Sequence, residues 1–191
     1  MCKLLPIIQK LAPVSSKEWA KAKSLFSARS YQADEAIFSA GDKPKGVYFL
    51  THGIGRYYYI DSEGRERNKS LVKAGGAFAS ISTVVNAEQS PFYAQTITPC
   101  NTVVIDYDDL IRLSDENKNW ATFVRRVYEN LALKKENREA DFLMKSARQR
   151  YEGFLDEFGV QNDLIPLRHV AMYLGITDVT LSRIRREMGM I

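Results

Sequence analysis

No glycine and no proline occurs between Asn101 and Gly153. These two residue types interrupt helices more strongly than any others, so their absence permits a long helical region. From about Asp106 the apolar residues follow a helical period, and this period continues to about Phe142. The sequence therefore predicts a helical second half, in which one long helix connects two separate units.

The segment before Asp106 has a different pattern, in which short runs of β-branched and aromatic residues alternate with glycine-containing turns. Five runs are predicted to be strands: 36–38, 47–50, 55–60, 70–72 and 102–105. The turns at 40–42, 52–53, 61–64 and 74–76 contain glycines that adopt positive φ readily. Regularly spaced strands of this kind predict a small antiparallel barrel or jelly roll, preceded by a short amphipathic helix at 17–27.

Composition narrows the possible functions. The chain is 45% hydrophobic and 26% charged with a net charge of +4, which is typical of a soluble globular protein and permits an anionic partner. No apolar run approaches the ~20 residues of a membrane span, and the apolar start is broken too soon for a signal peptide, so we expect a cytoplasmic protein with no membrane partner. Cys2, Cys100, His52 and His169 are too few to build a disulfide framework, an iron–sulfur cluster or a cupin-like metal site. We expect no metal and no enzymatic activity.

The long helix carries an apolar seam. Four residues recur at alternating spacings of four and three, the pattern of a coiled coil: Trp120, Val124, Val127 and Leu131. One interpretation is that this seam pairs with a second copy of the chain, which makes 117–144 a dimerisation helix. The other is that the same face packs on the barrel of its own chain. A further amphipathic helix is predicted at 146–158, ending at Gly159.

The most informative segment, 167–186, has the pattern of a helix-turn-helix. Two steeply crossing helices leave space at their contact for only a small side chain, which Ala171 provides, and Gly175 suits the positive φ of the turn. Pro166 favours the start of the first helix, and Thr177 can cap the second. The apolar residues on the inner faces are Val170, Leu174, Ile176, Leu181 and Ile184. An ordinary helical hairpin is the alternative, but it does not need the polar residues that point outward here.

These outward residues are suited to DNA. Arg183 lies where its guanidinium can make a bidentate contact to a guanine, and Thr180, Ser182 and Arg186 are placed to contact phosphates or neighbouring bases. The predicted DNA-binding residues are Thr177, Thr180, Ser182, Arg183, Arg185 and Arg186. For Arg185 and Arg186, the alternative is a solvated, positively charged helix end.

The order of these parts resembles the Crp/Fnr family of bacterial transcription regulators. The local matches are Gly-Val-Tyr-Phe-Leu at 46–50, His-Gly at 52–53, the hairpin at 61–64, and the segments 173–177 and 180–184. The resemblance implies an α+β fold with a cyclic-nucleotide-binding-type barrel, a dimerising helix and a C-terminal winged-helix-type DNA-binding domain. It also implies double-stranded DNA and a second copy of the chain as partners, and RNA polymerase if the protein is an activator.

Two departures from the family concern the nucleotide pocket and the recognition helix. Cyclic-AMP-binding relatives carry Phe-Gly-Glu and a later phosphate-binding arginine, whereas this chain has no arginine between Arg67 and Arg112, so a buried phosphate would lack its charge-assisted contact. The degenerate pocket is expected to consist of Phe78, Ala79, Ser80, Phe92 and Tyr93. Lys69 and Lys73 are candidate point charges there. In the recognition helix, Asp178-Val179 replaces the frequent Arg-Glu pair, which changes the expected base preference.

Three parts are therefore predicted: a sensor barrel at 1–116, the dimerisation helix at 117–144 and a DNA-binding domain at 145–191. The predicted function is sequence-specific transcription regulation without a response to cyclic AMP and without a bound cofactor. The barrel is either filled by its own side chains or open to another small-molecule effector. The alternative function is a ligand-sensing module that acts through protein partners and carries a vestigial DNA-binding domain.

Overall fold

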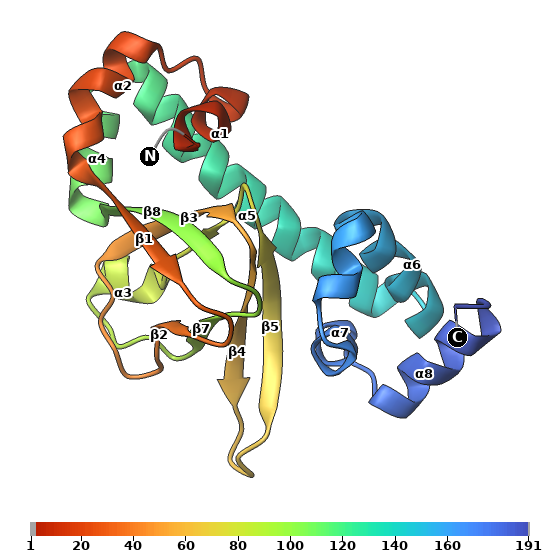
Figure 1. Ribbon diagram of the computed structural model, residues 1–191. Coiled ribbons are helices and arrows are strands. Elements are labelled where there is room, and N and C mark those ends of the chain that lie inside the picture. Colours follow the sequence, from red (N-terminus) through yellow and green to blue (C-terminus); the bar gives the residue numbers. More distant parts are fainter. Residues whose placement is uncertain (1–2, 191) are drawn as a thin grey trace.

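The structure, a computed structural model, describes residues 3–190 and has the predicted α+β fold (Figure 1). An antiparallel barrel precedes one long helix, and the helices that follow this long helix in the chain lie at its C-terminal end, beside the barrel. Among residues 3–190, no helix combines the length and the apolar character needed to cross a membrane.

The barrel consists of two four-stranded antiparallel sheets. Their strand orders are β1-β8-β3-β6 and β2-β7-β4-β5, an arrangement typical of a jelly roll. The strands are β1 (Phe26–Tyr31), β2 (Ala36–Phe38), β3 (Gly46–His52), β4 (Ile54–Ile60), β5 (Glu66–Lys73), β6 (Ala77–Phe78), β7 (Tyr93–Thr96) and β8 (Cys100–Asp106). A short helix, α3 (Ile81–Asn86), lies between β6 and β7.

All five predicted strands are present, but the predicted helix at 17–27 is wrong at its end. Helix α2 (Ser16–Ala22) is capped by Ser15 and is followed by a 3-10 turn, η1 (Lys23–Leu25). Phe26 already belongs to β1, where it pairs with Ile105 of β8. This pairing spans most of the barrel sequence, so the local helical pattern gives way to a long-range ladder.

The long helical region consists of two helices, α4 (Tyr107–Glu116) and α5 (Lys118–Met144). The break has a local cause, because the side chain of Asn117 accepts hydrogen bonds from the backbone N–H groups of Asn119 and Trp120 and so caps α5. The first turns of α5 pack on an N-terminal helix, α1 (Leu4–Leu11), which the sequence pattern did not predict.

The C-terminal part contains α6 (Ala147–Phe158), a 3-10 segment η2 (Gly159–Leu164), α7 (Leu167–Leu174) and α8 (Asp178–Glu187). Ser146 caps α6, and Gly159 ends it with a φ of 52°. This part shares an apolar core with the barrel, because Ile54 and Leu71 belong to the same buried cluster as the inner faces of α6, α7 and α8. No strand follows α8 as far as Met190, so the described chain contains the helix-turn-helix without a wing.

Candidate nucleic-acid interface

The predicted helix-turn-helix is formed by α7 and α8. Gly175 ends α7 with a φ of 67°, a backbone conformation that favours glycine. A Cβ at this position would also lie 2.7 Å from the ring of Phe142 on α5, so both the backbone and the packing require glycine. Thr177 caps α8 by accepting a hydrogen bond from the backbone N–H of Thr180 (3.2 Å). The small residue at the helix crossing, Ala171, is buried as expected.

The outer face of α8 is exposed. Ser182, Arg183 and Arg186 lie on it, together with Val179, which is 80% exposed. Figure 1 places α8 at the end of the molecule, on the side of the C-terminal part that faces away from the barrel. Because α7 packs against β5, the outer face of α8 remains accessible to a large partner.

Arg185 has a different environment from the other predicted DNA-binding residues. Its side chain is half-buried and donates a hydrogen bond from Nη1 to the hydroxyl of Tyr151 on α6 (2.7 Å). On α8, Arg185 lies four residues after Leu181 and next to Ile184, both of which are buried. It therefore faces inward and ties α8 to α6.

The apolar seam of α5 divides into two regions. Trp120 and Val124 are buried within their own chain, where Trp120 stacks on Phe26 at a ring distance of 5.9 Å. Val127 packs partly against the same core, whereas Leu131 is exposed. The alternative interpretation, packing on the chain's own barrel, thus describes Trp120 and Val124, and only the later part of the seam presents surface to a partner.

The barrel interior is filled by aromatic side chains. Tyr57 packs edge-on against Phe78 and Phe92, with both ring distances 5.2 Å. The Tyr57 hydroxyl accepts a hydrogen bond from the backbone N–H of Ala79 (2.7 Å), and burial raises the pKa of this hydroxyl. Ser80 is also buried and accepts a hydrogen bond from the Thr83 hydroxyl (2.8 Å).

The three remaining candidates for the predicted pocket, which lie on β5 and β7, have different environments. Tyr93 stacks on Tyr58 at 4.9 Å, on the face opposite to Tyr57, so it does not line the interior. Lys69 does, because it occupies a bulge in β5 and places its ammonium 3.6 Å from the centre of the Phe92 ring. Lys73 points elsewhere and donates a hydrogen bond to the Glu157 carbonyl on α6.

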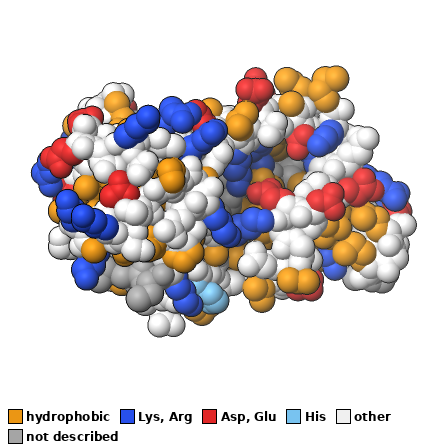
Figure 2. Space-filling view, turned by 90° about the horizontal axis from the view of Figure 1, so that it is seen from above, with side chains coloured by type: hydrophobic (Ala, Val, Ile, Leu, Met, Phe, Trp, Pro, Cys, Tyr) orange, Lys and Arg blue, Asp and Glu red, His pale blue; other side chains and the backbone are white. Residues whose placement is uncertain are grey.

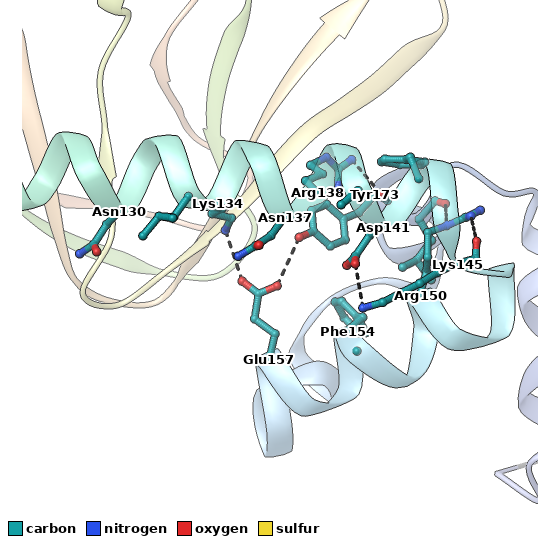
Figure 3. Close-up of a pocket in the computed structure, with 15 residues that line it drawn as sticks. Asn130, Lys134, Asn137, Arg138, Asp141, Lys145, Arg150, Phe154, Glu157 and Tyr173 are labelled. Atoms are coloured by element: carbon teal, nitrogen blue, oxygen red, sulfur yellow. Dashed lines mark hydrogen bonds and ion pairs between the residues drawn. The ribbon is translucent and has the colours of Figure 1, made fainter.

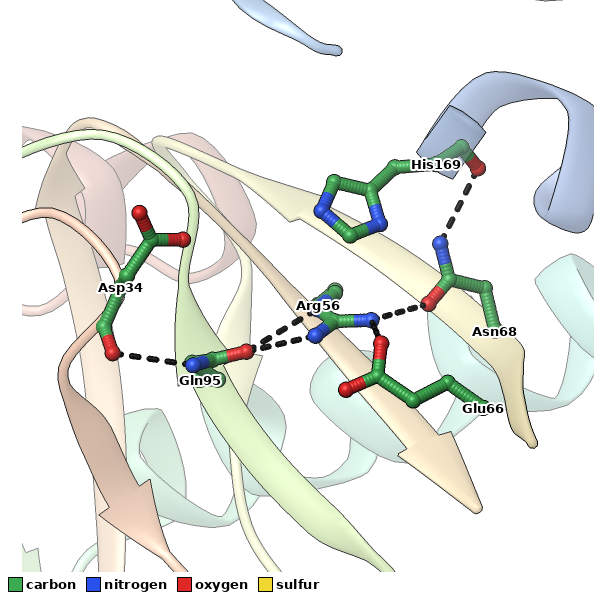
Figure 4. Close-up of polar contacts among 6 residues, drawn as sticks. All are labelled: Asp34, Arg56, Glu66, Asn68, Gln95 and His169. Atoms are coloured by element: carbon green, nitrogen blue, oxygen red, sulfur yellow. Dashed lines mark hydrogen bonds and ion pairs between the residues drawn. The ribbon is translucent and has the colours of Figure 1, made fainter. Parts of the chain in front are cut away.

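A buried polar network joins the outer face of β4 and β5 to α7 (Figure 4). Arg56 is 4% exposed and donates hydrogen bonds to the side chains of Glu66 (2.6 Å), Asn68 (3.1 Å) and Gln95 (2.7 Å). Asn68 in turn donates to the backbone carbonyl of His169 (3.0 Å). Burial, together with nearby Arg56, lowers the pKa of His169 to about 4. No sequence pattern indicated this contact.

Comparisons with known proteins agree with this architecture. A sequence profile of the cyclic nucleotide-binding domain matches residues 28–117. The fumarate and nitrate reduction regulatory protein of Yersinia pestis is 26% identical over 166 residues, a match that covers 80% of this chain and 65% of that relative. The chain thus spans slightly less than two thirds of the relative's length.

Solved structures match over most of the chain. A CooA mutant from Carboxydothermus hydrogenoformans matches with a TM-score of 0.70 and 18% identity, covering 92% of this chain and 82% of the other. FixK2 from Bradyrhizobium japonicum matches with a TM-score of 0.65 and 21% identity, covering 86% and 84%. The chain is therefore similar in overall fold to these solved structures and contains a cyclic nucleotide-binding-type domain at 28–117. A third structure, the c-di-GMP-responsive global regulator CLP of Xanthomonas campestris, matches with a TM-score of 0.69 and 13% identity, covering 91% of this chain and 92% of the other.

Proposed function

We propose that this chain is a sequence-specific DNA-binding transcription regulator of the Crp/Fnr type. The observation that carries the proposal is the exposed outer face of α8, held by a tight helix-turn-helix and bearing Arg183, Arg186 and Ser182. A helix of this kind fits the major groove, where an arginine reads a guanine through two hydrogen bonds. We assign this reading to Arg183, and contacts to phosphates or neighbouring bases to Thr177, Thr180, Ser182 and Arg186.

The three parts of the chain have different proposed roles. We propose that 1–116 forms the sensor-type barrel, 117–144 the dimerisation helix and 145–191 the DNA-binding domain. Leu131 is 37% exposed on α5, and it supplies apolar surface for a second copy. A two-fold dimer would present two α8 helices to a palindromic site. RNA polymerase is a further partner if the protein activates transcription.

We also propose that cyclic AMP is not the effector. The interior that would hold it is occupied by Tyr57, Phe78 and Phe92, and within residues 3–190 the Lys69 ammonium is the one cation that faces these rings. CLP, which shares the fold, responds to c-di-GMP, so a different effector has a parallel within this architecture. A ligand at a hundred times its Kd adds about 2.7 kcal/mol of stability, so cyclic AMP is expected to leave the melting temperature unchanged.

DNA affinity decides between the regulator and its alternative. Genomic fragments selected by the protein should bind with an affinity that falls steeply as salt rises, because neutralised phosphates release counterions. Arg183→Ala should lower affinity for the selected site by about 1–3 kcal/mol. Arg112→Ala is the matched control, since Arg112 is an exposed arginine on α4, far from α8 in the chain. Weak, salt-insensitive binding that Arg183→Ala leaves unchanged would instead support a module acting through protein partners.

A further inference from the structure

A large opening of the described molecule lies outside the barrel. This open cavity of about 640 Å³ is lined by α5, α6 and the end of α7 (Figure 3). This volume is within the range of small-molecule binding sites. The face seen in Figure 2 is hollowed between its two sides, and Lys and Arg side chains gather around the hollow with acidic side chains beside them.

The charges that line the cavity are unbalanced. Its basic residues are Lys134, Arg138, Lys145 and Arg150, and its acidic residues are Asp141 and Glu157. Both acids are already paired with lysines, because Asp141 contacts Lys145 at 2.7 Å and Glu157 contacts Lys134 at 3.3 Å. The two arginines of the lining therefore have no carboxylate partner within the cavity.

Those arginines contact carbonyl groups instead. Arg138 donates to the Tyr173 carbonyl (2.8 Å), and Arg150 donates to the Leu174 and Lys145 carbonyls (3.1 and 2.8 Å). Tyr173 and Leu174 are the last two residues of α7, where the helix dipole is negative. Burial of the Arg138 side chain lowers its pKa. A guanidinium with five donors retains capacity for an anion after these bonds are made.

Aromatic rings supply a second type of wall. Phe142 lies between the two guanidinium groups, 4.7 Å from Arg138 and 5.1 Å from Arg150, and Tyr173 lies 4.2 Å from Arg138. Phe154 completes the apolar part of the lining. Flat rings beside unpaired cations form a suitable surface for a planar group that bears a negative charge.

Gly153 keeps the cavity open. It lies in the interior of α6, where glycine costs about 1 kcal/mol of helix stability relative to alanine. A Cβ at this position would meet no atom within 4 Å, and its φ is not in the left-handed region, so neither packing nor backbone conformation requires glycine here. The missing side chain leaves space along one wall of the cavity.

We propose that this cavity is a binding site for an organic anion, a carboxylate or phosphate carried on a planar ring. Because the same guanidinium groups hold the end of α7, an anion in the cavity would be coupled to the position of the helix-turn-helix. That regulatory meaning rests on the proposed DNA-binding function, whereas the binding itself does not. Binding is therefore measured on the full-length protein without DNA.

The test uses phenyl phosphate, benzoate and 1-naphthoate as probes in titration calorimetry, with phenol and inorganic phosphate as controls. At least one ring-bearing anion should bind at one site per chain, at least about tenfold more tightly than either control. Gly153→Phe should weaken that binding at least about tenfold by filling the cavity, whereas Gly153→Ala should leave it within about twofold. Arg150→Met should remove the preference for phenyl phosphate over phenol.

Amide chemical shifts of the unsubstituted protein provide a measurement that does not depend on a variant folding. The Gly153 signal should move on addition of the probe, and the Gly41 signal, from a turn of the barrel, should not. Failure of all three anions to bind at millimolar concentration would overturn the proposal. So would binding that Gly153→Phe leaves unchanged, or shifts confined to the barrel. Loss of DNA binding alone would overturn the proposed function and leave this site standing.

Discussion

The barrel interior and the cavity between α5, α6 and α7 differ in the charged side chains that line them. In the barrel, the single cation that faces the aromatic rings is Lys69, and burial together with nearby Lys135 lowers its pKa to about 8. In the cavity there are four basic residues and two acids, and the two arginines among the basic residues donate hydrogen bonds to backbone carbonyls instead of carboxylates. Aromatic side chains therefore fill the barrel interior, whereas the helical half has open, charged space.

Packing gives the largest expected contrast between the two regions. Phe78→Ala removes a ring with no exposed surface from the barrel core and should lower the free energy of unfolding by about 3–5 kcal/mol. Phe142→Ala removes a ring that is 40% exposed beside the cavity and should cost about 1 kcal/mol. Urea unfolding of both variants measures the difference. Equal losses would show that the barrel interior is no better packed than the cavity wall.

The contact between the regions depends on Arg56. Arg56→Met leaves Glu66, Asn68 and Gln95 without their shared donor and should lower the free energy of unfolding by about 2–3 kcal/mol. Arg65→Met is the control from the same hairpin, since its ion pairs are exposed and should contribute at most about 0.5 kcal/mol. If the two variants unfold alike, the network in Figure 4 does not stabilise the docking of α7 on the barrel.

The pH dependence of stability tests the same contact from the helical side. The folded-state pKa of His169 is about 4 against an ordinary value of 6.5, so the unfolded chain binds the proton more readily. Stability should therefore be full above about pH 7 and fall as the pH drops, by about 2 kcal/mol at pH 5. His169→Gln should flatten this slope. The carboxyls of Glu18 and Asp61, with pKa values of about 2, respond at lower pH.

Local requirements explain what the sequence could predict. Gly175 allows a left-handed turn, Ala171 allows a close helix crossing, and Thr177 caps a helix. Each of these requirements is met within a few residues. The helix-turn-helix was therefore predicted with its parts in place. Strands β1 and β7 were missed, because their stability comes from partners far along the chain, as in the pairing of Phe26 with Ile105. The contact of Asn68 with His169 was missed for the same reason, since no pattern records such a distant pair.

The width of a helix face accounts for two further differences between the sequence pattern and the structure. On α5, Phe123 joins Trp120, Val124 and Val127 to form a stripe at positions i, i+3, i+4 and i+7, which is the wider face of a core helix rather than a two-position seam. The same spacing from Leu181 places Arg185 on the inner face of α8. Both differences arise because a helix face is wider than the line of residues at alternating spacings of four and three.

The smallest expected effect concerns the wall of the cavity. Gly153→Ala should raise the free energy of unfolding by about 0.5–1 kcal/mol, because alanine lowers the backbone entropy of the unfolded chain and its Cβ meets no atom within 4 Å. The same change at Gly55 in the barrel should destabilise the protein, since its Cβ would lie 2.7 Å from both the Gln95 carbonyl oxygen and the Phe78 ring. Thermal unfolding of the two variants reports opposite signs if one region is open and the other filled. A loss of stability in Gly153→Ala would mean that the space beside α6 is closed in solution.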